Sequence, residues 1–260
     1  MIMEDAGKVK SLTKALMILE CFISTESELG VSEIADKLSL PKSTVSNVLS
    51  TFQNAGYLRQ NSHSNKYALD YGLLKYGYII IQNLRLRQLI LPYMHQISNT
   101  TNQVCMLAVP YQNEVLYLDS AVTTKNQWSL RHITGETAPL YCTGLGKVIL
   151  AFQNDEMTEH YLQCTHFEKI TKNTLCTEME LRENIAMIRR NGYALDDREH
   201  EENIKCVAFP ILSKTGSLIA AVSVTGNAGE FDQRFIEKTV GFVSEILSPL
   251  QFLLSDELNS

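Results

Sequence analysis

Apolar residues in the first fifty positions recur every three or four residues, which is the spacing of amphipathic helices. The pattern predicts three short helices, over residues 12–22, 31–38 and 42–52. Ser11 is a suitable N-cap for the first helix, and Pro41 suits the first turn of the third, where its missing N–H costs nothing. The second and third helices are separated by a short turn, as in a helix-turn-helix.

The third of these helices carries polar side chains between its apolar positions and has no carboxylate there. The polar residues are Lys42, Ser43, Thr44, Ser46 and Asn47. Hydroxyl and amide groups suit base edges and phosphates, and a helix N-terminus suits phosphate. The pattern therefore predicts a recognition helix for the major groove, although a helical hairpin inside any domain would show the same periodicity.

Two short β-type runs follow, over residues 57–60 and 66–69, around a polar tip at 61–65. They predict a hairpin, and three helices followed by a hairpin make a winged helix-turn-helix domain over residues 1–70. Arg59 and Lys66 in this hairpin are candidate phosphate contacts.

Residues 70–87 have apolar positions at helical spacing and predict one helix, which we assign as a linker over 71–88. A helix this apolar between two domains needs a partner surface. A second copy is the expected partner, because a homodimer would present two recognition helices to two half-sites.

The pattern from residue 89 onward changes to strands mixed with helices. It predicts strands over 104–109, 114–119, 128–133, 204–212 and 218–225, and helices over 89–99, from about 143, over 178–190 and from Asp232. Hairpins between several strands, with helices on one side, favour an α+β domain with a mainly antiparallel sheet over residues 89–260.

Charge is divided unevenly between the two halves. Residues 1–90 carry a net charge of +2, and residues 91–260 carry −8, which gives −6 for the chain. A mildly basic first domain fits phosphate contacts. No segment is apolar enough for a membrane span or signal peptide, so we expect a cytoplasmic protein with no membrane partner. Six cysteines without a CxxC pair are expected to be reduced and buried.

Residues 139–147 resemble a phosphate loop, but the first glycine of that motif is missing and Val148 stands where Ser or Thr would bind Mg²⁺. What remains is a glycine-opened helix N-terminus. Its N–H groups could hold a carboxylate, or the segment is only a tight turn into a packed helix.

An acidic run over residues 192–202 is expected to be a solvated loop. Asp196, Asp197 and His200 also leave open a metal site or acid–base catalysis, but no further ligand stands at suitable spacing. Cys206 lies in an apolar strand and is expected to be a buried thiol. We therefore expect no metal and no cofactor.

Four segments in this order resemble the IclR family of bacterial transcription regulators: LPKSTVSNVLSTFQNAGYL, PLYCTGLGKVILA, GYALDDREHEENIKCVAFPIL and GSLIAAVSVTG. The resemblance spans about residues 8–252. It implies a winged helix, a dimerising linker helix and a GAF-like domain that binds a small effector, often a carboxylate, in a dimer or dimer of dimers.

The resemblance also implies the residues of the effector pocket: Leu130, Gly144, Leu145, Asp196, Ile204, Cys206, Ser223 and Thr225. Two departures from the family pattern stand out. Asn47 replaces a frequent arginine, which would change the operator, and Asn203 replaces a usual glycine beside the pocket.

These observations together predict a regulator that binds operator DNA and responds to a small carboxylate, with repression expected rather than activation. Two alternatives remain open on the residues alone. One is an enzyme that uses Asp196, Asp197 and Cys206, and the other is a redox sensor that uses Cys142 and Cys206.

Overall fold

The computed structural model describes residues 9–23, 28–123, 133–250 and 254. The chain divides into two compact units, Met1–Asn83 and Leu84–Ser260, each of which is described by itself. Leu130 and all but the last residue of the predicted strand over 128–133 lie outside the described residues.

The first unit has the three helices and the hairpin that the apolar spacing predicts. They are α1 (Lys10–Glu20), α2 (Val31–Leu38), α3 (Lys42–Asn54), β1 (Leu58–Gln60) and β2 (Tyr67–Leu69), with a 3-10 turn, Cys21–Ile23, after α1. Apolar side chains from each of these elements form one core, which includes Ile18, Ile34 and Leu49. Two predicted helix starts are wrong: Val9 and Pro41, outside the helices, occupy the N-cap positions of α1 and α3.

Helix α4 (Leu74–Asn83) follows strand β2 of the hairpin after a short 3-10 turn, Tyr71–Leu73. A Cβ on Gly72 would lie 2.1 Å from the Gly56 carbonyl oxygen, so the two backbones are in direct contact. The phenol oxygens of Tyr57 and Tyr76 lie 2.6 Å apart, and the two rings pack edge to face. Helix α4 therefore belongs to the winged-helix unit.

The predicted continuous helix over residues 70–87 is wrong. Leu84 has φ −73° and ψ 88°, which is not helical, and a new helix, α5 (Arg85–Thr101), begins directly after it. The break separates α4 from α5 and coincides with the division between the two units.

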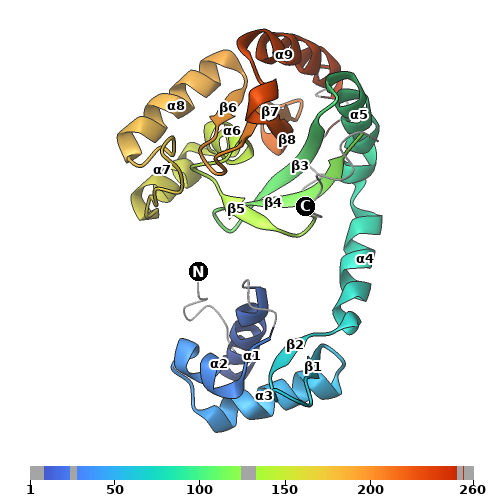
Figure 1. The fold of residues 1–260 in the computed structure, drawn as a ribbon, viewed down its shortest axis with the longest axis vertical. Coiled ribbons are helices and arrows are strands. Elements are labelled where there is room, and N and C mark those ends of the chain that lie inside the picture. The colour runs from blue at the N-terminus through green and yellow to red at the C-terminus, as the bar shows by residue number, and fades with distance from the viewer. Residues whose placement is uncertain (1–8, 24–27, 124–132, 251–253, 255–260) are drawn as a thin grey trace. The chain divides into compact units, whose positions relative to one another are not determined.

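The second unit is built on a six-stranded antiparallel sheet with strand order β5-β4-β3-β8-β7-β6 (Figure 1). The strands are β3 (Val104–Tyr111), β4 (Glu114–Ala121), β5 (Thr137–Pro139), β6 (Ala194–Asp197), β7 (Ile204–Leu212) and β8 (Leu218–Asn227). The short strands β5 and β6 form the two edges of the sheet and were not predicted from the sequence.

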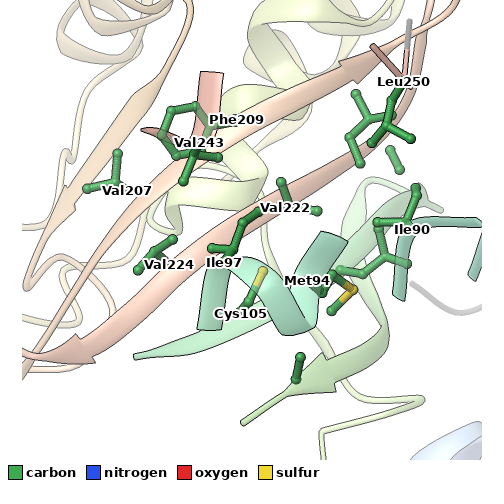
Figure 2. Close-up of a cluster of buried hydrophobic side chains, with 14 of the residues drawn as sticks. Ile90, Met94, Ile97, Cys105, Val207, Phe209, Val222, Val224, Val243 and Leu250 are labelled. Carbon is green, nitrogen blue, oxygen red and sulfur yellow. The ribbon is translucent and has the colours of Figure 1, made fainter. Parts of the chain in front are cut away.

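Helices cover both faces of this sheet, which corrects the expectation that they lie on one side. On one face, α5 and α9 (Gln233–Leu247) pack over a large apolar core. Figure 2 shows Met94 and Ile97 of α5 close to strand residues such as Cys105 and Val222.

On the other face lie α6 (Gly144–Phe152), α7 (Asp155–Cys164) and α8 (Glu178–Asn191), which share a second core. Gly192 ends α8 with φ 79°, as its position after the predicted helix suggested. In the described part of the chain, no helix is long and apolar enough to cross a membrane.

Candidate functional site

The polar face of α3 is open to solvent while its apolar face is buried. Val45 and Leu49 are fully buried in the core of the first unit. On the rest of the helix surface, Lys42, Ser43, Ser46 and Asn47 are exposed and Thr44 is half-buried. The helix is thus anchored by one side and presents the predicted DNA-contacting residues on the other.

The two predicted phosphate contacts of the hairpin differ in their surroundings. Arg59 is exposed on β1. Lys66 is half-buried, and its ammonium lies 2.7 Å from the carboxylate of Glu33 on α2. The same carboxylate accepts a hydrogen bond of 2.6 Å from the Gly30 N–H, so it also stabilises the start of α2.

A cavity of about 420 Å³ opens in the second unit between the sheet and the N-terminus of α6. Seven of the eight residues predicted for an effector pocket line it: Gly144, Leu145, Asp196, Ile204, Cys206, Ser223 and Thr225. The eighth, Leu130, lies outside the described residues. A cavity of this size suits a small metabolite.

Strand register explains why residues so distant in sequence meet here. Asp196 is paired with Cys206 across β6 and β7, and Cys206 is paired with Thr225 across β7 and β8. Residues paired in this way point to the same side of a sheet. Ser223, two residues before Thr225, shares that side, and the two hydroxyl oxygens lie 2.9 Å apart.

The two glycines of the first turn of α6, Gly144 and Gly146, allow the helix to approach the sheet closely. A Cβ on Gly144 would lie 2.5 Å from the Cys206 sulfur, and one on Gly146 would lie 2.4 Å from the Leu140 backbone. Thr143 caps the helix by accepting a hydrogen bond of 3.1 Å from the Gly146 N–H. The Gly144 N–H contacts the Cys206 sulfur, so the positive end of α6 faces the cavity.

Asp196 is buried at the wall of the cavity. Its side chain accepts a hydrogen bond of 2.8 Å from the backbone N–H of Glu199. Removal from water raises the pKa of Asp196 to about 7, and the nearby Glu199 carboxylate adds to this shift. The group is therefore divided between its neutral and charged forms near neutral pH.

The thiols at this site are poor nucleophiles. Burial raises the pKa of Cys206 far above its ordinary value, and burial raises that of Cys142 to about 12. Since the thiolate is the reactive form, these values disfavour both the enzyme and the redox-sensor alternatives. Among the described residues, no group of three His, Cys, Asp or Glu side chains could hold a metal ion.

The expectation of a solvated loop over residues 192–202 is wrong for its central part. Residues Ala194–Asp197 form the edge strand β6, and Asp196 and Glu199 are only 5% and 6% exposed. Glu199 pairs with Lys147 of α6, whose side chain is fully buried. Asp197 instead pairs near the surface with Arg198 and Lys205.

Sequence reasoning missed several residues that line the cavity. They are Gln103, Val104, Met106, Tyr117, Ile133, Glu136, Thr137, Ala138, Thr143, His200, Glu201, Gly226, Asn227 and Glu230. Met106 could have been found, because it alternates with buried Cys105 and Leu107 along a predicted strand. Tyr117 of β4 is held with its phenol in the cavity wall, where burial strongly raises its pKa.

Family models match both units of the chain. Residues 11–62 match the IclR helix-turn-helix domain, and residues 79–247 match the bacterial transcriptional regulator IclR C-terminal domain. Together these segments contain the proposed recognition helix and all the described cavity-lining residues.

Individual relatives agree with this assignment. The chain is 29% identical to the HTH-type transcriptional regulator XynR of Escherichia coli, over 84% of this chain and 86% of the relative. It is 28% identical to the transcriptional repressor IclR of the same organism, over 85% and 81%.

Solved structures show the same fold. An IclR family transcriptional regulator from Brucella abortus superposes with a TM-score of 0.81 at 28% identity, over 97% of this chain and 95% of that structure. An IclR homolog from Microbacterium hydrocarbonoxydans, solved with 4-hydroxybenzoate, has a TM-score of 0.71 at 24% identity, over 92% and 99%. The chain belongs to the IclR family and is a DNA-binding transcriptional regulator rather than an enzyme.

Proposed function

We propose that this regulator is a repressor whose operator binding is modulated by a small carboxylate bound in the cavity of the second unit. One observation carries the proposal: the N-terminus of α6 opens into a cavity of about 420 Å³ that Asp196, Ser223 and Thr225 also line. A helix N-terminus attracts a carboxylate, and the hydroxyl and carboxyl groups would bind other polar substituents of the ligand.

We assign the ligand contacts to groups that line the walls of the cavity. The Leu145 N–H and the Gly144 N–H, which is shared with the Cys206 sulfur, lie at the positive end of α6 and would bind the acid group. Ile204 and Cys206 supply apolar surface, and Leu130 completes the predicted set. The Microbacterium protein solved with 4-hydroxybenzoate, an acid with a distal hydroxyl, makes that compound a suitable first probe.

On the DNA side, we assign base contacts to Ser43, Thr44, Ser46 and Asn47 of α3, and phosphate contacts to Lys42, Arg59 and Lys66. The support is the exposed polar face of α3 above a buried apolar face. Asn47 is suited to adenine, since its amide can donate and accept at the major-groove edge of that base.

We also propose a homodimer, or a dimer of dimers, formed through the linker assigned to residues 71–88. Within it, α4 and the turn before it expose a series of large apolar side chains: Tyr71, Leu74, Tyr78, Ile79 and Ile80. Such a surface on a regulator of palindromic operators is expected to be covered by a second copy.

Repression is the proposed direction because two of the relatives are named as repressors. They are the transcriptional repressor IclR of Escherichia coli and the acetate operon repressor of Salmonella typhimurium.

A gel shift with the DNA upstream of the protein's own gene, titrated with a panel of small carboxylates that includes 4-hydroxybenzoate, tests this function. We expect a retarded band that one acid releases or strengthens, and transcription from the same DNA that falls when the protein binds. Retention of the band with every acid would overturn the effector assignment. Activation of transcription would overturn the repressor assignment.

A further inference from the structure

Lys147, in the first turns of α6, is buried behind the cavity wall and does not line the cavity. Lys147 is fully buried, and its ammonium donates a hydrogen bond of 2.8 Å to the carbonyl oxygen of Leu195. The same ammonium is paired with the carboxylate of Glu199. Both partners flank Asp196 in the sequence, one on β6 and one in the turn after it.

Glu199 is fixed through its backbone as well as its side chain. Its N–H donates to the Asp196 carboxylate over 2.8 Å, and its carbonyl oxygen accepts a hydrogen bond of 2.6 Å from the Thr174 hydroxyl. The chain of contacts thus runs from α6 through Lys147 and Glu199 to Asp196, which lies in the cavity wall.

We propose that Lys147 is a positioning residue, which locks the first turn of α6 and the neighbouring Asp196 carboxyl group into one arrangement, so that a ligand in the cavity meets both in a fixed geometry. This inference rests on the proposed function, because it takes the cavity to be the effector site. Lys147 contacts no ligand in this scheme and acts only through Leu195 and Glu199.

The physical chemistry of the pair supports a positional role. A buried ion pair contributes little net stability compared with apolar side chains of similar volume, because both charges lose their hydration. The pair does supply a fixed geometry. The Lys147 ammonium on α6 can reach both the Leu195 carbonyl oxygen and the Glu199 carboxylate only in one position of α6 relative to β6. Loss of one partner would leave the other charge buried and uncompensated.

The test measures Asp196 directly, in the full-length protein without ligand or DNA. Aspartate side chains are labelled with ¹³C at the carboxyl carbon, the Asp196 signal is assigned with an Asp196→Asn variant, and its titration is followed by NMR. Glu199→Gln keeps a hydrogen-bond acceptor for Lys147 but removes the negative charge. Lys147→Met/Glu199→Gln removes both charges together, which avoids an unpaired buried ion. Glu178→Gln, in an exposed pair with Arg182, is the matched control.

We expect Glu199→Gln to weaken proton binding at Asp196 by roughly tenfold, because the nearby anion is lost and the Lys147 cation stays. In the double variant the pH midpoint of the Asp196 titration should rise again toward its wild-type value. The backbone amide at position 199 should exchange with solvent at least tenfold faster than in the wild type. The control should change neither quantity.

An Asp196 titration that is the same in Glu199→Gln and in the wild type, or an amide at position 199 whose exchange is unchanged in the double variant, would overturn the positioning role. Failure of the effector proposal would look different. In that case the titration and exchange would change as described, while no acid altered DNA binding.

Discussion

Gly144 lies so close to Cys206 that a single added methyl group would reach within 2.5 Å of the sulfur. Gly144→Ala should therefore push α6 away from β7, change the shape of the cavity and destabilise the second unit by about 1–3 kcal/mol. We expect operator binding to persist and its response to the effector to be lost. The measurements are a thermal melt and the gel shift with and without the active acid.

A matched control for this change is Gly241→Ala. Gly241 lies within α9, and a Cβ there would meet no atom within 4 Å. This variant should be slightly stabilised, because alanine favours a helix over glycine by roughly 1 kcal/mol, and should keep its response to the acid. An unchanged response in Gly144→Ala would mean that the ligand does not bind against the first turn of α6.

Asn47→Ala should reduce operator affinity by roughly 1–3 kcal/mol and relax the preference at one base position. The reason is that Asn47 is exposed on α3, on the helix face away from buried Val45 and Leu49. Binding to a set of operators with single base changes would measure both effects. Asn54→Ala, at the exposed C-terminal end of the same helix, is the control and should bind like the parent. Equal binding by both variants would remove α3 as the recognition helix.

The two lysines assigned to phosphates should behave differently. Lys42→Gln should weaken binding to all sequences alike and lower the slope of affinity against salt by about 1, since one fewer counterion is released. Lys66→Gln should have a smaller effect, because its ammonium already lies 2.7 Å from Glu33. Affinities measured at several salt concentrations would separate the two. A larger loss at Lys66 would show that DNA displaces Glu33 from this pair.

Stability should depend on pH through Asp196, whose pKa is raised to about 7 mainly by burial. Between about pH 4 and pH 7 the folded protein holds a proton that the unfolded chain has released, so the contribution of Asp196 to stability falls as the pH rises. Asp196→Asn removes this term and keeps an acceptor for the Glu199 N–H. The free energy of unfolding of the variant, relative to that of the wild type, should therefore be about 2–3 kcal/mol higher at pH 8 than at pH 5.

Urea unfolding followed by circular dichroism at the two pH values would measure this difference. Asp197→Asn is the control, because the pKa of Asp197 is lowered by its pairing with Arg198 and Lys205. Its contribution to stability is present above the ordinary pKa and is lost only in acid. A variant-to-wild-type difference at position 196 that does not change with pH would contradict the buried, partly neutral state of this carboxyl group.

The winged-helix unit was predictable because its helices are amphipathic and short. Ile34 of α2 and Leu49 of α3 each belong to an apolar series with the helical period, and each faces the common core. The helix break at Leu84 was not predictable in the same way, because this leucine fits the apolar period on both sides. Only the backbone angles of the folded chain reveal that α4 and α5 are separate.

Two features of the second unit show where local patterns fail. Val207, Ala208 and Phe209 are consecutive and all buried, a run that indicates helices on both faces of the sheet. The expectation of helices on one side of the sheet does not follow from this run, which indicates two covered faces. Burial of Lys147 depends on a carboxylate 52 residues away, so no local pattern contained it.

The contact of Gly72 with Gly56 and the pairing of Tyr57 with Tyr76 make α4 an extension of the winged helix. If copies associate through α4, the residues before Leu84 determine both the DNA contacts and the spacing of the two recognition helices. The chemistry of the cavity is then encoded separately, after Leu84. A chimera joined at Leu84 to the effector domain of a relative would then recognise the same DNA and answer to a different acid. Such a junction would let a lineage of regulators change its inducer without changing its operators.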